Sequence, residues 1–407
     1  MAPSLAIEST VAIDDNIIDD NVAASAPGAV GRGGGLYIKQ SDGTTLTGNQ
    51  IRGNVASAEM RGTGGGLVVN CSEITLTANL IAGNYANATS TYPGWGGGLF
   101  LDKTTPEWRT LTLIGNIISG NVAAARGEGE GGGLYLSLTP VRLFGNRIEG
   151  NIASIEMPGR GGGIYLDSPG MGPLQGNVIS GNVASMADDG FGGGIYLDFA
   201  DRLLLAENTI VGNAATQDPG AASQGGGIYM RDSVPITLTN NVVTGNRAYD
   251  QGSGLWFDGF PYNPAVRVSM LHTTLADNGG CGQGLYVGDT TILTLTNTIV
   301  AGHNDAGIRV SQGSTVTLEA TLWFSNGIHL DSAGHVSAGA INIYDDPAFA
   351  GGGDYHLTAG SAARDAGVPC GLAIDIDGRL RPIGPAPDLG ADEFAYPNYL
   401  PLAIKES

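Results

Sequence analysis

A run of three glycines recurs along the chain at nearly constant spacing, and it limits the possible folds more than any other feature. One copy, residues 161–167, reads Gly-Gly-Gly-Ile-Tyr-Leu-Asp. Steps of 27 to 35 residues separate successive copies, the last two of which are degenerate, and the copies start at Gly33, Gly64, Gly96, Gly131, Gly161, Gly192, Gly225, Gly252 and Gly282. A period of this length is typical of stacked-repeat proteins, in which each unit contacts only its neighbours.

A three-residue slot follows each glycine run. It reads Leu-Tyr-Ile at 36–38, Ile-Tyr-Leu at 164–166 and Leu-Trp-Phe at 255–257. Its outer positions are apolar in every copy, whereas the middle position drifts to Arg and His in the last copies. This alternation is the pattern of a β-strand with one buried face, so we expect the middle residue to point outward.

Two asparagines five residues apart, with an aliphatic residue between them, end each repeat. The pairs begin at Asn49, Asn79, Asn116, Asn146, Asn177, Asn208 and Asn241. Asparagine tolerates left-handed backbone and forms hydrogen-bonded ladders between stacked copies, so we place these pairs at a corner. We predict three short strands and three bends per repeat, stacked into about eleven coils of a right-handed parallel β-helix.

The repeat fades near residue 341, which divides the chain into three parts. We predict a parallel β-helix over residues 1–340, a capping segment over 341–395 that covers the open edge of the last coil, and a possible sorting or anchoring tail over 396–407. Asp375, Asp377 and Asp388 in the capping segment are candidate calcium ligands. Arg364, Arg379 and Arg381 are the alternative partners, and we favour salt bridges.

Charge and composition exclude several function classes. A formal net charge of −20 repels nucleic acid and anionic membranes, and it also repels anionic polysaccharides unless metal ions bridge the contact. Three cysteines imply no disulfide framework, and no apolar run approaches the roughly 20 residues of a membrane span. Residues 1–6 lack the basic start of a secretory signal. We expect that such a signal has been removed and that the protein is a monomer located outside the cell or on its surface.

The repeats and the C-terminal segment carry a family resemblance. Gly-Gly-Gly-Ile-Tyr-Leu and Ile-Ser-Gly-Asn-Val-Ala resemble the repeats of bacterial right-handed parallel β-helix proteins, including the polymorphic outer-membrane type. The segments 346–349, 354–357, 375–382 and 388–393, which read Asp-Pro-Ala-Phe, Asp-Tyr-His-Leu, Asp-Ile-Asp-Gly-Arg-Leu-Arg-Pro and Asp-Leu-Gly-Ala-Asp-Glu, are similar to the closing segment of choice-of-anchor Q proteins. The resemblance implies a secreted or cell-surface protein and supplies no catalytic residues.

An aromatic column is the first candidate site. If the middle slot residues face outward, their rings form a ladder along one side of the rod, flanked by hydrogen-bonding groups that suit sugar hydroxyls. Aromatic residues also pair favourably between neighbouring strands without any ligand. The predicted ligand-binding residues are Tyr135, Tyr165, Tyr196, Tyr229, Trp256 and Asp258.

A catalytic or metal site is the second candidate. Asp167 and Asp198 occupy the same position in successive repeats, so their carboxylates are expected to lie about one coil spacing apart, with Arg231 one coil further on. Two such charges favour a bridging cation, and Ca²⁺ is the possible guest, although Asp also commonly ends a strand. The polygalacturonase-like motifs are incomplete, because 302–304 reads Gly-His-Asn in place of Gly-His-Gly and no Arg-x-Lys occurs.

These observations predict a non-catalytic rod that adheres to or binds carbohydrate, with a polysaccharide or cell-surface glycan as partner. A polysaccharide lyase or glycoside hydrolase on the same scaffold is the alternative, with Asp167, Asp198 and Arg231 as its candidate residues. A purely structural spacer is the third hypothesis. No cofactor is required by the first or the third.

Overall fold

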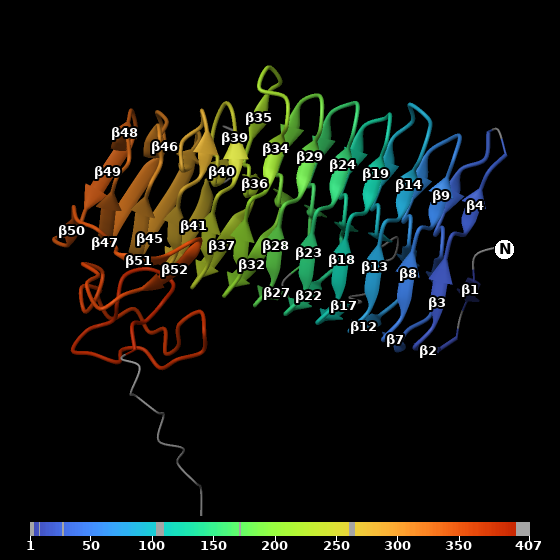
Figure 1. The fold of residues 1–407 in the computed structure, drawn as a ribbon, viewed down its shortest axis with the longest axis horizontal. Coiled ribbons are helices and arrows are strands. Elements are labelled where there is room, and N and C mark those ends of the chain that lie inside the picture. The colour runs from blue at the N-terminus through green and yellow to red at the C-terminus, as the bar shows by residue number, and fades with distance from the viewer. Residues whose placement is uncertain are drawn as a thin grey trace, which may run out of the picture.

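A computed structural model describes residues 4–7, 9–26, 28–102, 110–170, 172–259 and 265–395 of the chain. These residues form a long rod of stacked coils, from which a C-terminal segment projects to one side (Figure 1). The predicted tail, residues 396–407, lies outside the described residues. The described part of the chain contains no helix that is long and apolar enough to cross a membrane.

Four parallel sheets run along the rod and are numbered here by their order within a coil, with the two-residue strands as sheet 4. Sheet 1 holds twelve strands: β1 (Ser4–Ile7), β6 (Leu36–Lys39), β11 (Leu67–Asn70), β16 (Leu99–Asp102), β21 (Leu134–Ser137), β26 (Ile164–Asp167), β31 (Ile195–Asp198), β36 (Ile228–Arg231), β40 (Leu255–Asp258), β44 (Leu285–Val287), β46 (Ala306–Val310) and β48 (Ile328–Ser332). Sheet 3 holds nine: β4 (Val22–Ala24), β9 (Val55–Ser57), β14 (Tyr85–Asn87), β19 (Val122–Ala124), β24 (Ile152–Ser154), β29 (Val183–Ser185), β34 (Ala214–Thr216), β39 (Arg247–Ala248) and β43 (Gly279–Gly280). Sheet 4 holds seven: β5 (Gly31–Arg32), β10 (Gly62–Thr63), β15 (Gly94–Trp95), β20 (Gly129–Glu130), β25 (Gly159–Arg160), β30 (Gly190–Phe191) and β35 (Ser223–Gln224).

Sheet 2 is the largest because most coils contribute two strands to it, one on each side of a bend. Its 22 strands are β2 (Ala12–Asp14), β3 (Ile17–Asp19), β7 (Thr44–Thr47), β8 (Gln50–Arg52), β12 (Ile74–Thr77), β13 (Leu80–Ala82), β17 (Leu111–Ile114), β18 (Ile117–Ser119), β22 (Val141–Phe144), β23 (Arg147–Glu149), β27 (Gly172–Gln175), β28 (Val178–Ser180), β32 (Asp201–Ala206), β33 (Thr209–Val211), β37 (Val234–Thr239), β38 (Val242–Thr244), β41 (Val266–Leu271), β42 (Thr274–Ala276), β45 (Thr291–Ala301), β47 (Thr315–Phe324), β49 (His335–Ala338) and β50 (Asn342–Ile343). An antiparallel pair, β51 (Phe349–Gly351) and β52 (Asp354–Leu357), lies beyond the rod.

The predicted parallel β-helix is confirmed, but the predicted three strands per coil are wrong. A typical coil has five strands, as in β5 to β9. The strands of sheet 4 are only two residues long, and the asparagine corner contains a three-residue strand of its own, so neither produces a visible period-two pattern. Sheet 1 has one strand more than the eleven predicted coils, because β1 pairs with β6 without a preceding glycine run.

The core of the rod is a continuous column of aliphatic side chains. The outer slot residues point inward as predicted; Ile164 and Leu166, for example, are fully buried. Glycine is required just before them. Gly161 has φ of +64°, and a Cβ on Gly162 would lie 2.4 Å from the backbone carbon of Val183 in the next coil. The chain therefore turns the corner into sheet 1 with no room for a side chain.

Both asparagine ladders are confirmed. In the first, Asn79 donates from Nδ2 to Oδ1 of Asn116 at 2.9 Å, and the backbone N–H of Asn79 donates to the same oxygen at 2.9 Å. The second Nδ2 hydrogen of Asn79 goes to the carbonyl of Leu46. Because these asparagines are buried, complete pairing removes the cost of their desolvation. The second ladder starts at Asn21 and continues through Asn54, Asn84, Asn121, Asn151, Asn182, Asn213, Asn246 and Asn278.

The C-terminal segment does not lie where we predicted it. Rather than covering the open edge of the last coil, it packs along the side of the rod, below β41 and β45 in Figure 1. Ala391 donates to Oγ1 of Thr274 at 3.0 Å, and Asn297 exchanges two hydrogen bonds with the backbone of Val368. Earlier coils present a mixture of outward residues in sheet 2, some charged, such as Arg147, and some apolar, such as Ile117 and Val178, whereas the segment covers apolar outward residues of the last coils. The covered residues are Ala276, Ile299, Ala301 and Leu322.

Candidate functional site

The middle slot residues of sheet 1 form the predicted aromatic ladder. Its rings, one per coil, are Phe100, Tyr135, Tyr165, Tyr196, Tyr229, Trp256 and Tyr286. Neighbouring ring centroids are 4.2 to 6.1 Å apart, and neighbouring planes differ by 4° to 12°. The parallel register of sheet 1 imposes this stacking, because equivalent residues lie directly above one another.

The expectation that these rings are displayed to solvent is wrong for the central part of the ladder. Tyr165, Tyr196, Tyr229 and Trp256 are only 3% to 8% exposed. Each ring covers the faces of its two neighbours, so a sugar has no free ring face to stack on between them. The tyrosines predicted to bind ligand therefore form, in this region, an apolar cluster outside the main core.

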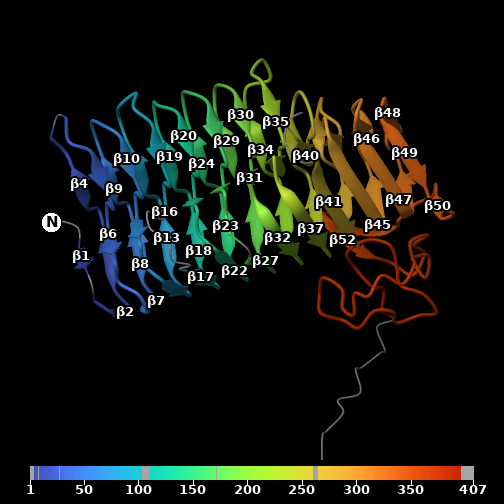
Figure 2. The ribbon, with the colours of Figure 1, turned by 180° about the vertical axis from the view of Figure 1, so that it is seen from behind.

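The strands of sheet 4 run beside those of sheet 1 (Figure 2), and their side chains contact one edge of the ladder. The ring of Phe191 packs edge-on against Tyr229, with centroids 5.7 Å apart. Arg160 donates from Nη1 to Oε1 of Glu130 at 3.0 Å, and burial raises the pKa of Glu130. Burial also raises the pKa of the Tyr196 phenol, to about 12. The ladder phenols thus stay protonated at neutral pH.

The predicted catalytic and metal-binding residues lie along the other edge. Asp167 and Asp198 are register neighbours, as predicted. Arg231 donates from Nε to Oδ1 of Asp198 at 3.1 Å and from Nη2 to Oδ2 at 2.5 Å, and this pairing raises the pKa of Arg231. Asp167 accepts hydrogen bonds from the hydroxyls of Ser137 and Ser168. The positive charge that calcium would supply beside Asp198 is therefore supplied by Arg231.

Asp258, the remaining predicted ligand-binding residue, lies in the next coil of the same row. Its Oδ1 accepts a hydrogen bond from the backbone N–H of Gly259 at 3.0 Å. Burial, reinforced by the nearby charges of Asp289 and Asp232, raises the pKa of Asp258 to about 6. The carboxyl is still mainly ionised at neutral pH, and together with Asp232 and Asp289 it makes this part of the row acidic.

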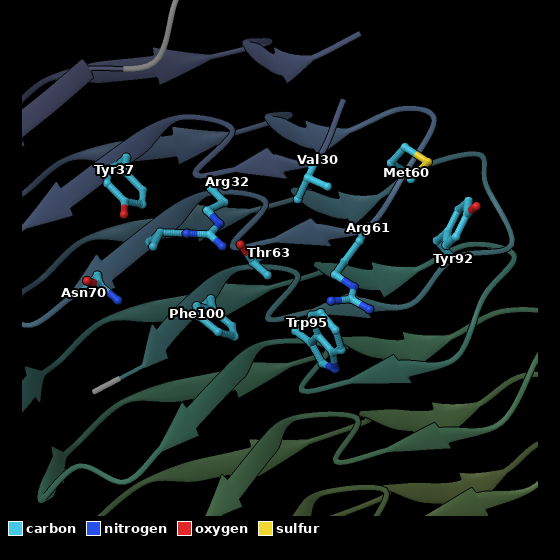
Figure 3. A pocket seen from close by; sticks show the side chains of 11 residues that line it. Val30, Arg32, Tyr37, Met60, Arg61, Thr63, Asn70, Tyr92, Trp95 and Phe100 are labelled. Atoms are coloured by element: carbon cyan, nitrogen blue, oxygen red, sulfur yellow. The ribbon is translucent and has the colours of Figure 1, made fainter. Parts of the chain in front are cut away.

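The ladder is interrupted near the N-terminus, and a cavity opens there. Val68 takes the middle slot position between Tyr37 and Phe100, and Thr63 takes the equivalent place in sheet 4 between Arg32 and Trp95. The side-chain columns of sheet 1 and sheet 4 thus both have a small residue in the same coil. The cavity has a volume of about 650 Å³ and is lined by Val30, Arg32, Tyr37, Met60, Arg61, Thr63, Val68, Asn70, Tyr92, Trp95 and Phe100 (Figure 3).

Cationic and aromatic groups share this cavity. The guanidinium of Arg61 lies 4.8 Å from the ring centroid of Trp95, within cation–π range. Arg32 and Arg61 are exposed, and neither side chain makes an ion pair or a hydrogen bond with another residue that the structure describes. We did not predict this site, although Val68 and Trp95 marked it: Val68 breaks the aromatic column, and Trp95 stands immediately before a glycine run.

A second cavity, of about 390 Å³, lies between the C-terminal segment and the rod. His356, Asp377 and Asp392 line it, and their ligand atoms lie within 4.8 Å of one another, as a metal site would need. Arg379 already pairs with Asp377 at 2.9 Å and with Asp392 at 3.2 Å. The predicted preference for salt bridges is confirmed for this arginine, whereas Arg381 pairs at 3.0 Å with Glu393, a partner that we did not predict.

Comparison with known proteins identifies the fold family. A family model described as a right handed beta helix region matches residues 4–151 and 141–337. The chain belongs to this β-helix family. No curated protein matches it.

Two solved structures are similar to this β-helix chain at low identity. The Dettilon tailspike protein gp208 is 13% identical, with a TM-score of 0.37; the match covers 81% of this chain and 62% of the tailspike. The chain thus spans less than two thirds of that protein's length. A hyper-glycosylated TibA fragment, residues 55–350, is also 13% identical, with a TM-score of 0.19. The match covers 84% of this chain and 100% of the fragment. Neither likeness bears on what this chain does.

Proposed function

We propose that this β-helix is a non-catalytic rod that binds carbohydrate outside the cell or at its surface. The observation that carries the proposal is the cavity between Tyr37 and Phe100, which combines aromatic walls with polar groups at its rim. Such a combination suits sugars, since a sugar ring has apolar faces and a hydroxylated edge, and binding sites are typically concave and apolar with a few polar groups.

The catalytic alternative has less support. A lyase or hydrolase needs an acid and a base that converge on one bond. Asp198 is held by Arg231, and Asp167 is held by two serine hydroxyls. Both groups serve as internal partners of neighbouring coils in this row. The spacer alternative, in turn, gives no role to the cavity.

A binding and turnover assay on one glycan array tests the proposal. The purified chain is incubated with neutral and acidic polysaccharides, with and without Ca²⁺, while retention and the release of reducing or unsaturated ends are recorded together. We expect retention without product. Product formation would support the lyase or hydrolase, and absence of both signals would support the spacer.

The choice of variant matters for this assay. Replacement of Tyr165 or Tyr196 by Ala removes a buried ring and destabilises the rod, so lost retention would be ambiguous. Trp95→Ala, on the partly exposed wall of the cavity, is the informative change, and we expect it to weaken retention at least tenfold.

A further inference from the structure

We propose that the break in the aromatic ladder is a slot for a single sugar ring that carries a carboxylate, such as a uronic acid residue. The inference rests on the proposed carbohydrate-binding function and specifies its site and ligand class. Its elements are the missing ring at Val68, the aromatic residues on either side, and the two arginines that line the same cavity.

The spacing of the coils fits one ring. Tyr37 and Phe100 are separated by two coil steps, or about 9.6 Å at about 4.8 Å per step. A ring held between two aromatic faces needs about 3.5–4.0 Å on each side, or about 7–8 Å in all. Val68 lies between these rings and is too short to fill the gap, but it is only 2% exposed, so neighbouring side chains cover it and a guest ring has to displace them. The slot therefore admits one ring where every later coil, as far as Tyr286, supplies its own.

The charge of the lining selects the ligand. Arg32 and Arg61 are the charged groups among the described lining residues, and none of these residues carries a carboxylate. Both arginines lack an ionic partner within the described parts of the chain, although the net charge of the protein is −20. A guanidinium recognises a carboxylate through two parallel hydrogen bonds. The pair thus forms a local cationic patch that attracts an anion which the rest of the surface repels.

The flanking side chains fix the orientation of the guest. Trp95 and Tyr92 lie on the sheet 4 side together with Arg61, whereas Asn70 lies at the opposite rim (Figure 3). Arg61 already lies against the Trp95 ring, which holds its guanidinium at the sheet 4 side of the cavity at little entropic cost. A sugar that stacks in the slot would direct its carboxylate to Arg61 and Arg32 and its hydroxyls to Asn70.

A titration of the full chain tests the slot. The probes are glucuronyl-β-1,4-glucose and digalacturonate, each compared with its methyl ester, which keeps the ring and removes the charge. The variants are Arg61→Gln and Val68→Tyr, and Val68→Tyr completes the ladder without leaving a cavity. Arg142→Gln, an exposed arginine on sheet 2, is the charge-matched control.

We expect at least one free acid to bind, its ester and Arg61→Gln to bind at least tenfold more weakly, and Val68→Tyr to lose binding at a melting temperature that does not fall. Arg142→Gln should bind like the native chain. Equal binding of acid and ester would overturn the ligand class, and equal binding by Val68→Tyr would overturn the site; both leave the carbohydrate function standing. Failure of both acids while the array retains other glycans overturns the inference alone, and failure of the whole array overturns the proposed function as well.

Discussion

The aromatic ladder has a closed part, from Tyr135 to Trp256, and an open part, between Tyr37 and Phe100. Both parts lie on the same parallel sheet and differ in the side chains at the middle slot position. From Tyr135 to Trp256 every coil contributes a ring, and the central rings are almost fully covered. Between Tyr37 and Phe100 one coil contributes Val68 instead, and a cavity of about 650 Å³ opens. Where the repeat is regular, the aromatic rings cover one another, and where it is broken, a cavity opens that we propose as the ligand site.

Removal of one ring from each part should give the largest difference in stability between the two parts. Tyr196→Ala leaves a buried gap in a stack and should lower the free energy of unfolding by about 3–5 kcal/mol. Tyr37→Ala, at a partly exposed position, should cost about 1 kcal/mol. Chemical denaturation of both variants measures the difference. Similar losses would mean that the closed ladder does not stabilise the rod more than the open one.

A second break in the repeat, in the asparagine ladder, should make stability depend on pH. His303 takes a ladder position between Asn278 and Asn326, and burial lowers its pKa to about 4. An unfolded histidine takes up a proton below its ordinary pKa of about 6.5, so stability is complete above that pH and falls as the pH drops toward 4.

The loss from His303 should be on the order of 2–3 kcal/mol between pH 7 and pH 4. His303→Asn restores the ladder residue and should flatten the dependence of the unfolding midpoint on pH. His272, whose pKa burial lowers to about 3, remains in both proteins and keeps the comparison matched. Identical pH profiles for the native chain and the variant would show that His303 is not the titrating group.

Loss of an arginine should lower the free energy of unfolding beside the closed part of the ladder but not beside the open part. Arg231→Gln leaves the buried carboxylate of Asp198 without its ionic partner and should cost about 2 kcal/mol. Arg61→Gln removes a side chain with no such partner and should change stability by less than about 0.5 kcal/mol. Addition of Asp198→Asn to Arg231→Gln should recover part of the loss. No recovery would contradict the assignment of this pair as internal.

Completion of the ladder should have a small stabilising effect. Val68→Tyr adds a stacked ring between Tyr37 and Phe100 and should raise the free energy of unfolding by about 1 kcal/mol. Differential scanning calorimetry at matched concentration measures it. A clear destabilisation would mean that the slot is narrower than one aromatic ring.

The parts of this structure that repeat could be predicted from the sequence. Ile164 and Leu166 indicated the inward face, and pairs such as Asn146 and Asn151 indicated the corner, because identical side chains in register must meet. The burial of the ladder could not be predicted, since it depends on Phe191 and its equivalents on strands only two residues long. The cavity was not predicted either. The prediction followed the residues that repeat, whereas Val68 and Thr63 depart from the repeat in the same coil.

The position of the C-terminal segment could not be predicted from the repeats. The segment covers apolar outward residues of sheet 2, such as Ile299 and Leu322. Earlier coils also present apolar outward residues, such as Ile117 and Val178, and these stay exposed. An apolar outward face therefore does not by itself mark the side of the rod that the segment covers.

A crystal structure of the chain with bound digalacturonate would show whether the break in the ladder is the binding site. We predict a sugar ring between Tyr37 and Phe100, next to Val68, with its carboxylate on Arg61 or Arg32. A sugar bound instead along the closed ladder from Tyr135 to Trp256, or in the cavity beside His356, would contradict it.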